Sequence, residues 1–138
     1  MIRAVIDTNV LVSGLIAALG NEALIVLAIQ QGLIKPYYSA EILEEYMEVL
    51  ARPKFGFPPN EIEAVISLMH SRGEHVLQPK PLASPSPDPT DEKFIVCALT
   101  AAVDFIVTGN KRDFPLELCG SVRIVNAGEL LERITFAM

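Results

Sequence analysis

The sequence predicts an α/β fold, in which helices cover both faces of a mainly parallel sheet. Short apolar runs rich in β-branched residues alternate along the chain with longer segments whose apolar residues recur at helical spacing. Several of the helical segments begin with a capping residue and end at glycine or proline. Strands that alternate with helices form βαβ units, whose strands are parallel. Ligands bind such sheets at the carboxyl ends of the strands, so polar residues there are the first candidates for function.

The N-terminal half of the chain is expected to form strands and helices in alternation. Residues 2–6 are an apolar run, and Asn9 can cap the helix that follows. Gly32 is expected to end the second helix. Pro36 favours an edge position for the next strand, and Ser39 can cap the helix after it. In order, the expected elements are a strand at 2–6, helices at 10–19 and 22–32, a strand at 33–39 and a helix at 40–51.

The C-terminal half continues this alternation. A helix with proline at its start and glycine at its end precedes a short strand, and a proline-rich loop then leads to a strongly apolar helix. In order, these elements are a helix at 58–73, a strand at 74–78, a loop at 79–90, a helix at 91–103, strands at 104–109 and 122–126, and a helix at 127–134. The loop is too short to separate two domains, so residues 1–138 are expected to form a single domain.

The composition fits one domain with a real core. The 138 residues are 51% hydrophobic and 20% charged, which argues against disorder. The net charge of −6 argues mildly against nucleic-acid binding, because phosphate affinity usually comes from lysine and arginine. Acids gathered around bound cations would give the same sum, so the charge does not decide. Cys97 lies in an apolar helical run and is interpreted as core packing, not as half of a disulfide.

The apolar N-terminus does not have the pattern of a signal peptide. Asp7 and Asn9 interrupt the segment that would have to be apolar, and no marked basic region precedes it. No uninterrupted apolar stretch reaches the roughly 18 residues that a membrane helix needs. We therefore expect a cytoplasmic protein with no membrane partner.

Three acidic residues stand at positions that a structural role explains only in part. Asp7 ends the first strand, where it could serve a ligand site or, equally, an Asx turn or a helix cap. On the helix at 40–51, Glu45 lies nearest the apolar stripe, although a solvated position is an equal alternative. Asp91 falls in line with the apolar face of its helix, but a carboxylate in the first helical turn is also favoured by the helix dipole. Asp88 could cap that turn instead.

The segment 108–113 directly follows another predicted strand and so lies at the same edge of the sheet as Asp7. Its Asn110 and Asp113 can supply oxygen ligands. Lys111 and Arg112 could contact phosphate, or they could be solvated loop charges.

The conjunction of these carboxylates predicts a metal site. Burying several like charges together is prohibitive unless a cation joins them. Oxygen ligands without a cysteine and histidine set favour Mg²⁺ or Mn²⁺ over zinc. His70 and His75 have no metal-ligand spacing and are interpreted as ordinary surface or packing residues.

Three segments resemble the PIN-domain family, the nuclease subunits of many prokaryotic toxin–antitoxin pairs. They are VIDTNVLVSGL, EEYMEVLARPKF and DPTDEKFIVCALTAAVDFIVTGNKRDF, and with the closing strand and helix they span nearly the whole chain. The first and third are fairly specific as an ordered pair, whereas the glutamate helix is weak by itself. The resemblance implies a three-layer α/β/α sandwich of the Rossmann-like type and a ribonuclease that depends on Mg²⁺ or Mn²⁺.

The resemblance also implies roles for individual residues. Thr8, Thr108 and Asn110 match small polar positions that support the site. Many relatives carry aspartate at position 110, so Asn110 is expected to weaken metal binding. Metal would be bound by Asp7, Asp91 and Asp113, while Glu45 could bind a second ion or orient the attacking water. The acidic quartet of the family maps onto Asp7, Glu45, Asp91 and Asp113.

The expected function is hydrolysis of RNA by a toxin. We expect single-stranded RNA as the substrate because its backbone can enter a crevice, an antitoxin that covers the site, and a homodimer. One alternative is a PIN-fold binding module that has lost its activity. Another is a phosphatase that uses Asp7 as its nucleophile. The haloacid-dehalogenase type expects a second aspartate two positions on, where Asn9 stands.

Overall fold

The computed structural model describes residues 1–82 and 89–134. Asp88 and most of the central part of the predicted proline-rich loop lie outside the described residues, so the expectation that Asp88 caps a helix is not addressed.

A parallel five-stranded sheet forms the centre of the structure. The strand order is β3-β2-β1-β4-β5, and each pair of neighbours runs parallel. This arrangement confirms the predicted α/β class. The strands are β1 (Ile2–Ile6), β2 (Ile34–Tyr38), β3 (Glu74–His75), β4 (Phe105–Val107) and β5 (Arg123–Val125).

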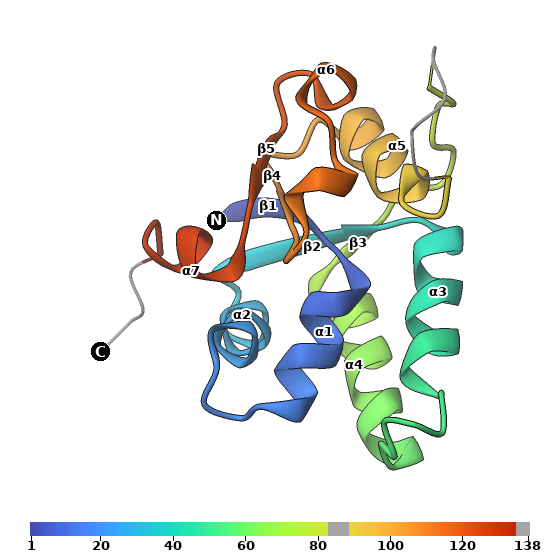
Figure 1. Cartoon of the computed structure of the whole chain (residues 1–138), viewed down its shortest axis with the longest axis vertical. Helices are drawn as coiled ribbons and strands as arrows, with labels where there is room; N and C mark the ends of the chain where they lie inside the picture. The colour runs from blue at the N-terminus through green and yellow to red at the C-terminus, as the bar shows by residue number, and fades with distance from the viewer. Residues whose placement is uncertain (83–88, 135–138) are drawn as a thin grey trace.

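Helices cover the two faces of this sheet and stand beyond one of its ends (Figure 1). α5 and α6 lie on one face, while α1, α2, α4 and α7 lie on the other. α3 stands beyond the carboxyl ends of the strands and packs against both α1 and α5. In the described residues the helices are α1 (Thr8–Ile16), α2 (Asn21–Gln30), α3 (Ala40–Leu50), α4 (Pro59–Arg72), α5 (Glu92–Ala101), the 3-10 turn η1 (Lys111–Asp113), α6 (Leu116–Cys119) and α7 (Ala127–Leu131).

The second half of the central strand β1 is buried from both faces, which explains why its sequence is apolar without alternation. Ala4, Val5 and Ile6 are each 0% exposed. A strand that is covered by helices on both sides has no polar face, so its residues do not alternate. Ile6 pairs with Val107 of β4, so the residues that follow these two strands come out side by side at the carboxyl edge.

Two local predictions are wrong. Asn9 does not cap α1, because the helix already begins at Thr8 and Asp7 holds the capping position in an extended conformation. β2 is not an edge strand, although it contains Pro36. Pro36 pairs with Ala4 on one side, and on the other side β3 pairs only with the two residues after it. The proline is tolerated because no neighbour pairs with it on that second side.

The helix caps at Ser39 and near Gly32 are confirmed. The Ser39 hydroxyl accepts a hydrogen bond from the backbone N–H of Ile42, at 3.3 Å. Gly32 has a φ of 76°, the left-handed conformation that ends a helix at little cost for glycine. In the described part of the chain, no single helix is long and apolar enough to cross a membrane; α1 and α2 would suffice only as a pair, and that pair is bent by 103°.

Candidate active site

The carboxyl edge of the sheet brings Asp7 and Thr108 together from residues far apart in the sequence. Asp7 follows β1, Thr108 follows β4, and these strands are neighbours. Backbone hydrogen bonds continue the ladder past both strand ends, since the N–H of Asp7 donates to the Val107 carbonyl at 2.9 Å. The Thr108 hydroxyl then donates to Oδ2 of Asp7 at 2.7 Å. Both side chains are buried, and the structure therefore holds the Asp7 carboxylate in a fixed orientation.

Burial makes Asp7 an unusual carboxylate. Its side chain is 5% exposed, and loss of solvation raises its pKa above the ordinary value for aspartate. Hydrogen bonds from the Thr108 hydroxyl and the Thr8 backbone lower this pKa, whereas the charges of Glu45 and Asp113 raise it further. Glu45 and Asp113 are thus the two carboxylates whose charges act on Asp7. Shifted carboxylates of this kind are typical of functional sites.

Glu45 faces this environment from α3, as its place beside the apolar stripe predicts. Ile42, Tyr46 and Leu50 form the buried face of α3. Glu45 is half-buried, and its Oε2 accepts a hydrogen bond from the hydroxyl of Thr8. The other glutamates of the helix are exposed, as expected, at Glu41, Glu44 and Glu48.

Tyr46 fixes α3 against the end of β1. Its hydroxyl donates to the carbonyl of Ile6, directly before Asp7. Burial raises the Tyr46 pKa well above its usual value, and the charge of Asp7 adds to this effect. The phenol is therefore a neutral donor. It holds the glutamate-bearing helix at the carboxyl edge of the sheet.

Asp91 lies directly before α5, at the N-cap position. Its side chain makes no capping hydrogen bond to the helix. A carboxylate at this position still faces the positive end of the helix dipole, so the metal-ligand role and the structural role both stay open. The residue is half-buried. Two positions further on, Lys93 donates to Oε1 of Glu45 at 2.7 Å and to the carbonyl of Thr90 at 2.6 Å.

The segment after β4 is organised around Thr108 and Asn110. The Thr108 hydroxyl accepts a hydrogen bond from the Asn110 backbone N–H at 3.0 Å. The Asn110 side chain donates from Nδ2 to Oδ2 of Asp113 at 2.8 Å. Lys111 Nζ lies 2.6 Å from Oε1 of Glu129, whereas Arg112 is exposed. The site thus extends from Asp7 through Thr108 to Asp113.

These oxygen donors suit a hard divalent cation, although they are not gathered into a ready coordination shell. Within residues 1–82 and 89–134, no group of three or more histidine, cysteine, aspartate or glutamate side chains is close enough to hold a metal ion. Hydrogen-bond donors and Lys93 contact these carboxylates. The chemistry of the donor set fits Mg²⁺ or Mn²⁺, and the ligand roles of Asp7, Asp91 and Asp113 stay predictions.

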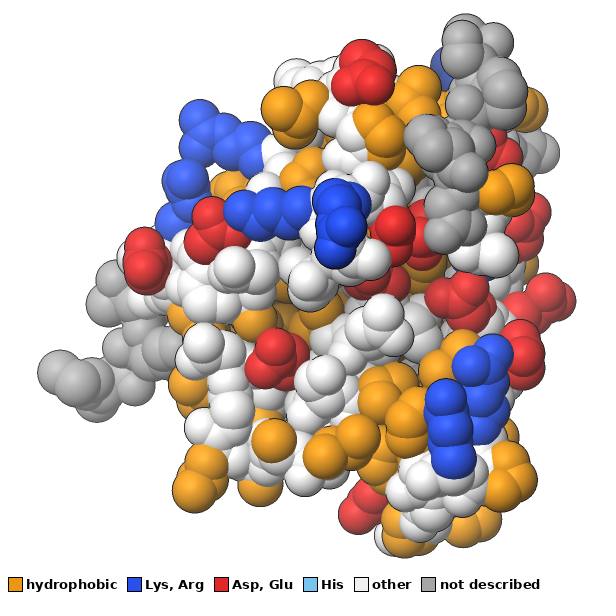
Figure 2. Space-filling model, viewed as in Figure 1, with side chains coloured by type: hydrophobic (Ala, Val, Ile, Leu, Met, Phe, Trp, Pro, Cys, Tyr) orange, Lys and Arg blue, Asp and Glu red, His pale blue; other side chains and the backbone are white. Residues whose placement is uncertain are grey.

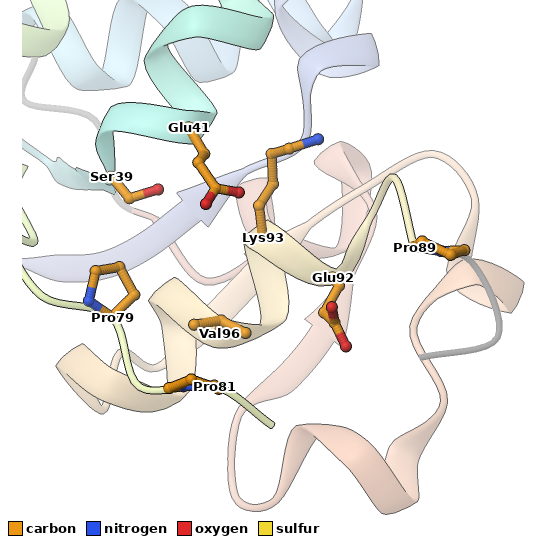
Figure 3. A pocket seen from close by; sticks show the side chains of 8 residues that line it. All are labelled: Ser39, Glu41, Pro79, Pro81, Pro89, Glu92, Lys93 and Val96. Atoms are coloured by element: carbon orange, nitrogen blue, oxygen red, sulfur yellow. The ribbon is translucent and has the colours of Figure 1, made fainter. Parts of the chain in front are cut away.

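Two hollows adjoin the site, and acidic side chains gather along α3 beside them (Figure 2). One hollow, of about 450 Å³, is lined by Lys93 and four residues of α3: Glu41, Glu44, Glu45 and Glu48. The other, of about 240 Å³, lies between the N-termini of α3 and α5. Figure 3 shows Glu41 pointing into it above Val96, while Pro79 and Pro81 form its apolar side. The two hollows share Glu41 and Lys93 in their linings.

Lys93 is the functional candidate that sequence analysis missed. The helical period directs position 93 away from the apolar face of its helix, so the sequence does not mark this lysine as part of the site. A lysine side chain, however, carries its charge several bonds away from the helix, so its partner depends on which element packs opposite. Here that element is α3. The only sequence signal is a lysine two positions after Asp91 in an acidic neighbourhood.

Comparison with known protein families agrees with this geometry. The sequence model of a family described as PIN domain matches residues 3–112. The match contains Asp7, Glu45 and Asp91, and Asp113 is the next residue beyond it. A comparison with curated proteins finds no match.

Proposed function

Because the chain belongs to the PIN-domain family, whose members are generally nucleases that use divalent metal ions, we propose that it is a metal-dependent endoribonuclease. The observation that carries the proposal is the buried Asp7 carboxylate. It lies at the carboxyl edge of a parallel sheet, is oriented by Thr108, and is repelled by Glu45 and Asp113. Shifted carboxylates cluster at functional sites, and a divalent cation would offset the like charges.

Each carboxylate has a role in this proposal. Asp7, Asp91 and Asp113 would bind Mg²⁺ or Mn²⁺. Glu45, held by the Thr8 hydroxyl, would orient the water that attacks the phosphorus. The ion, when bound, acidifies water and stabilises negative charge on the phosphoryl oxygens. Lys111 and Arg112 are exposed in the segment that joins Thr108 to Asp113, and they would contact phosphates of single-stranded RNA.

The proposed biological role is that of a toxin held in check by an antitoxin in the cytoplasm. Support comes from apolar side chains that the first two helices and their connection leave at the surface. Ile16, Leu19, Leu24 and Leu27 are 63%, 99%, 39% and 38% exposed. Exposed apolar side chains gathered on neighbouring elements are typical of surfaces that bind a partner, which here would be an antitoxin or a second copy of the chain.

Removal of divalent ions is expected to abolish RNA cleavage. The purified protein should cleave members of a panel of single-stranded RNAs in the presence of Mn²⁺ or Mg²⁺, and excess EDTA should reduce the rate to background. Adding Mn²⁺ beyond the EDTA should restore the rate. Cleavage that continues unchanged in EDTA would refute metal dependence.

Asn110 favours a second candidate, a PIN-fold module that binds RNA with little turnover. Its amide donates to Asp113, a proposed ligand, and supplies no charge of its own. We expect Asn110→Asp to tighten Mn²⁺ binding and raise cleavage by about tenfold, since one more negative charge faces the ion. Calorimetric Mn²⁺ titration and single-turnover cleavage measure the two effects. If the wild type binds Mn²⁺ and RNA without cleaving and Asn110→Asp cleaves, the second candidate is correct.

A further inference from the structure

Lys93 forms the least exposed of the ion pairs in the described chain. The Lys93 and Glu45 side chains are 18% and 22% exposed, and their charged atoms are 2.7 Å apart. The pairs Lys35–Glu74, Arg52–Glu48 and Lys111–Glu129 each have at least one side chain that is 45% or more exposed. Solvent screens the Lys93–Glu45 pair least, so it should have the strongest electrostatic effect of these pairs.

The ammonium group of Lys93 lies beside the carboxylate of Glu45, which also contacts the residue next to Asp7. Glu45 uses one carboxylate oxygen for Lys93 and the other for the Thr8 hydroxyl. Thr8 follows Asp7, whose carboxylate feels the charge of Glu45. Lys93 therefore lies against the carboxylate whose charge acts on Asp7. In Figure 3 its side chain rises from α5 so that the ammonium points away from Pro79 and Pro81.

A divalent ion in this neighbourhood would compete with Lys93. Both cations attract Glu45, and they repel each other across a half-buried space. A divalent ion that binds Glu45, or that lies near it, binds most tightly when the ammonium group of Lys93 has moved away. The Lys93 side chain is long and flexible, so it can swing away without a change in the backbone.

We propose that Lys93 is the resident counter-ion of the active site, which stabilises the carboxylates without metal and is displaced from Glu45 when a divalent ion binds. This rests on the proposed metal-dependent function. It makes Lys93 a positioning residue that acts through Glu45. The consequence is a lower metal affinity than the same carboxylates would have without the lysine.

The test is Mn²⁺ binding to Lys93→Gln, measured by calorimetry with the full chain. We expect affinity to rise by about tenfold or more, the scale of one charge-assisted hydrogen bond. Without metal the melting temperature should fall, and saturating Mn²⁺ should raise it by more than in the wild type. Lys93→Arg keeps the charge and should retain the wild-type affinity. Arg52→Gln, which breaks the exposed pair with Glu48 of α3, should change neither quantity.

Each outcome decides between the alternatives. A lysine that only ties α5 to α3 would lower stability with and without Mn²⁺ and leave affinity unchanged, and this result would overturn the proposal. Weaker Mn²⁺ binding by Lys93→Gln would overturn it too. If neither the wild type nor Lys93→Gln binds Mn²⁺, the proposed metal dependence itself fails. If both bind Mn²⁺ with equal affinity, only the counter-ion role of Lys93 fails.

Discussion

Replacing Asp7 with asparagine is expected to reduce RNA cleavage by about 10²–10³-fold or more, the scale of removing one preorganised group that stabilises a transition state. Asparagine keeps the shape of the side chain and can still accept a hydrogen bond from Thr108. It loses the charge that a divalent ion requires. Single-turnover cleavage in Mn²⁺ measures the loss. Glu63→Gln, which neutralises an exposed carboxylate on α4, is the control and should cleave like the wild type.

The same variant should be more stable than the wild type when metal is absent. Burial raises the pKa of Asp7 in the folded state above its unfolded value. Protonated Asp7 therefore stabilises the fold. This contribution to the free energy of unfolding is fully present below the pKa of the unfolded state, and it is lost as pH rises through the pKa of the folded state. In EDTA at neutral pH the wild type has lost this contribution, whereas asparagine does not titrate. A gain of about 1 kcal/mol would raise the melting temperature by roughly 3–6 °C.

Two results would contradict this account of Asp7. Cleavage by Asp7→Asn at the wild-type rate would remove the residue from the active site. A variant that unfolds at a lower temperature in EDTA at neutral pH would show that the ionised carboxylate stabilises the fold. Melting curves of both proteins across the acid to neutral range separate these possibilities, because the difference between them should grow as pH rises.

The backbone scaffold of the site could be predicted from the sequence because it depends on local patterns. An apolar run that stops at Asp7 marks a strand end, and parallel neighbours place their ends together. Helical periodicity places Glu45 beside the apolar stripe of its helix, and the structure has the strand end at Ile6 and Glu45 half-buried. These patterns fix where a Cα lies and which way its Cβ points. They are enough to locate the site.

The contacts inside the site could not be predicted in this way, because they depend on tertiary partners. Lys93 finds Glu45 through the packing of α5 against α3. Pro36 sits in an inner strand because β3 is only two residues long. The short turn η1 arises where Asn110 and Asp113 bond to each other, which no hydrophobic period signals. Sequence analysis therefore found the carboxylates and missed the residues that hold them.

Thr108 is the residue whose loss should damage this arrangement most without touching a charge. Its side chain is 0% exposed, donates to Asp7 and accepts from the Asn110 backbone. Thr108→Val keeps the volume but removes both hydrogen bonds. It leaves a buried carboxylate without its donor, so we expect a loss of roughly 2–4 kcal/mol in the free energy of unfolding. Metal affinity or cleavage should fall by about 10–100-fold, as for residues that orient metal ligands.

Thr108→Ser separates the hydroxyl from the methyl group. Serine keeps both hydrogen bonds and removes one buried methyl, so its cost in stability should be only about 1 kcal/mol, with cleavage close to that of the wild type. Urea unfolding in EDTA and cleavage in Mn²⁺ measure both variants. Equal losses for valine and serine would mean that packing, not the hydrogen bond to Asp7, is the role of Thr108.

A double-mutant cycle ties the two residues together. If Thr108 acts by stabilising the charge of Asp7, then Thr108→Val should cost less when Asp7 is already asparagine, because a neutral amide suffers less from the lost donor. The coupling should lie within the roughly 0.5–3 kcal/mol seen for residues in direct contact. Strict additivity would mean that the 2.7 Å contact carries no charge stabilisation. Because both variants keep their volume, a coupling in the cycle would come from electrostatics, the same force that a divalent ion uses at this edge of the sheet.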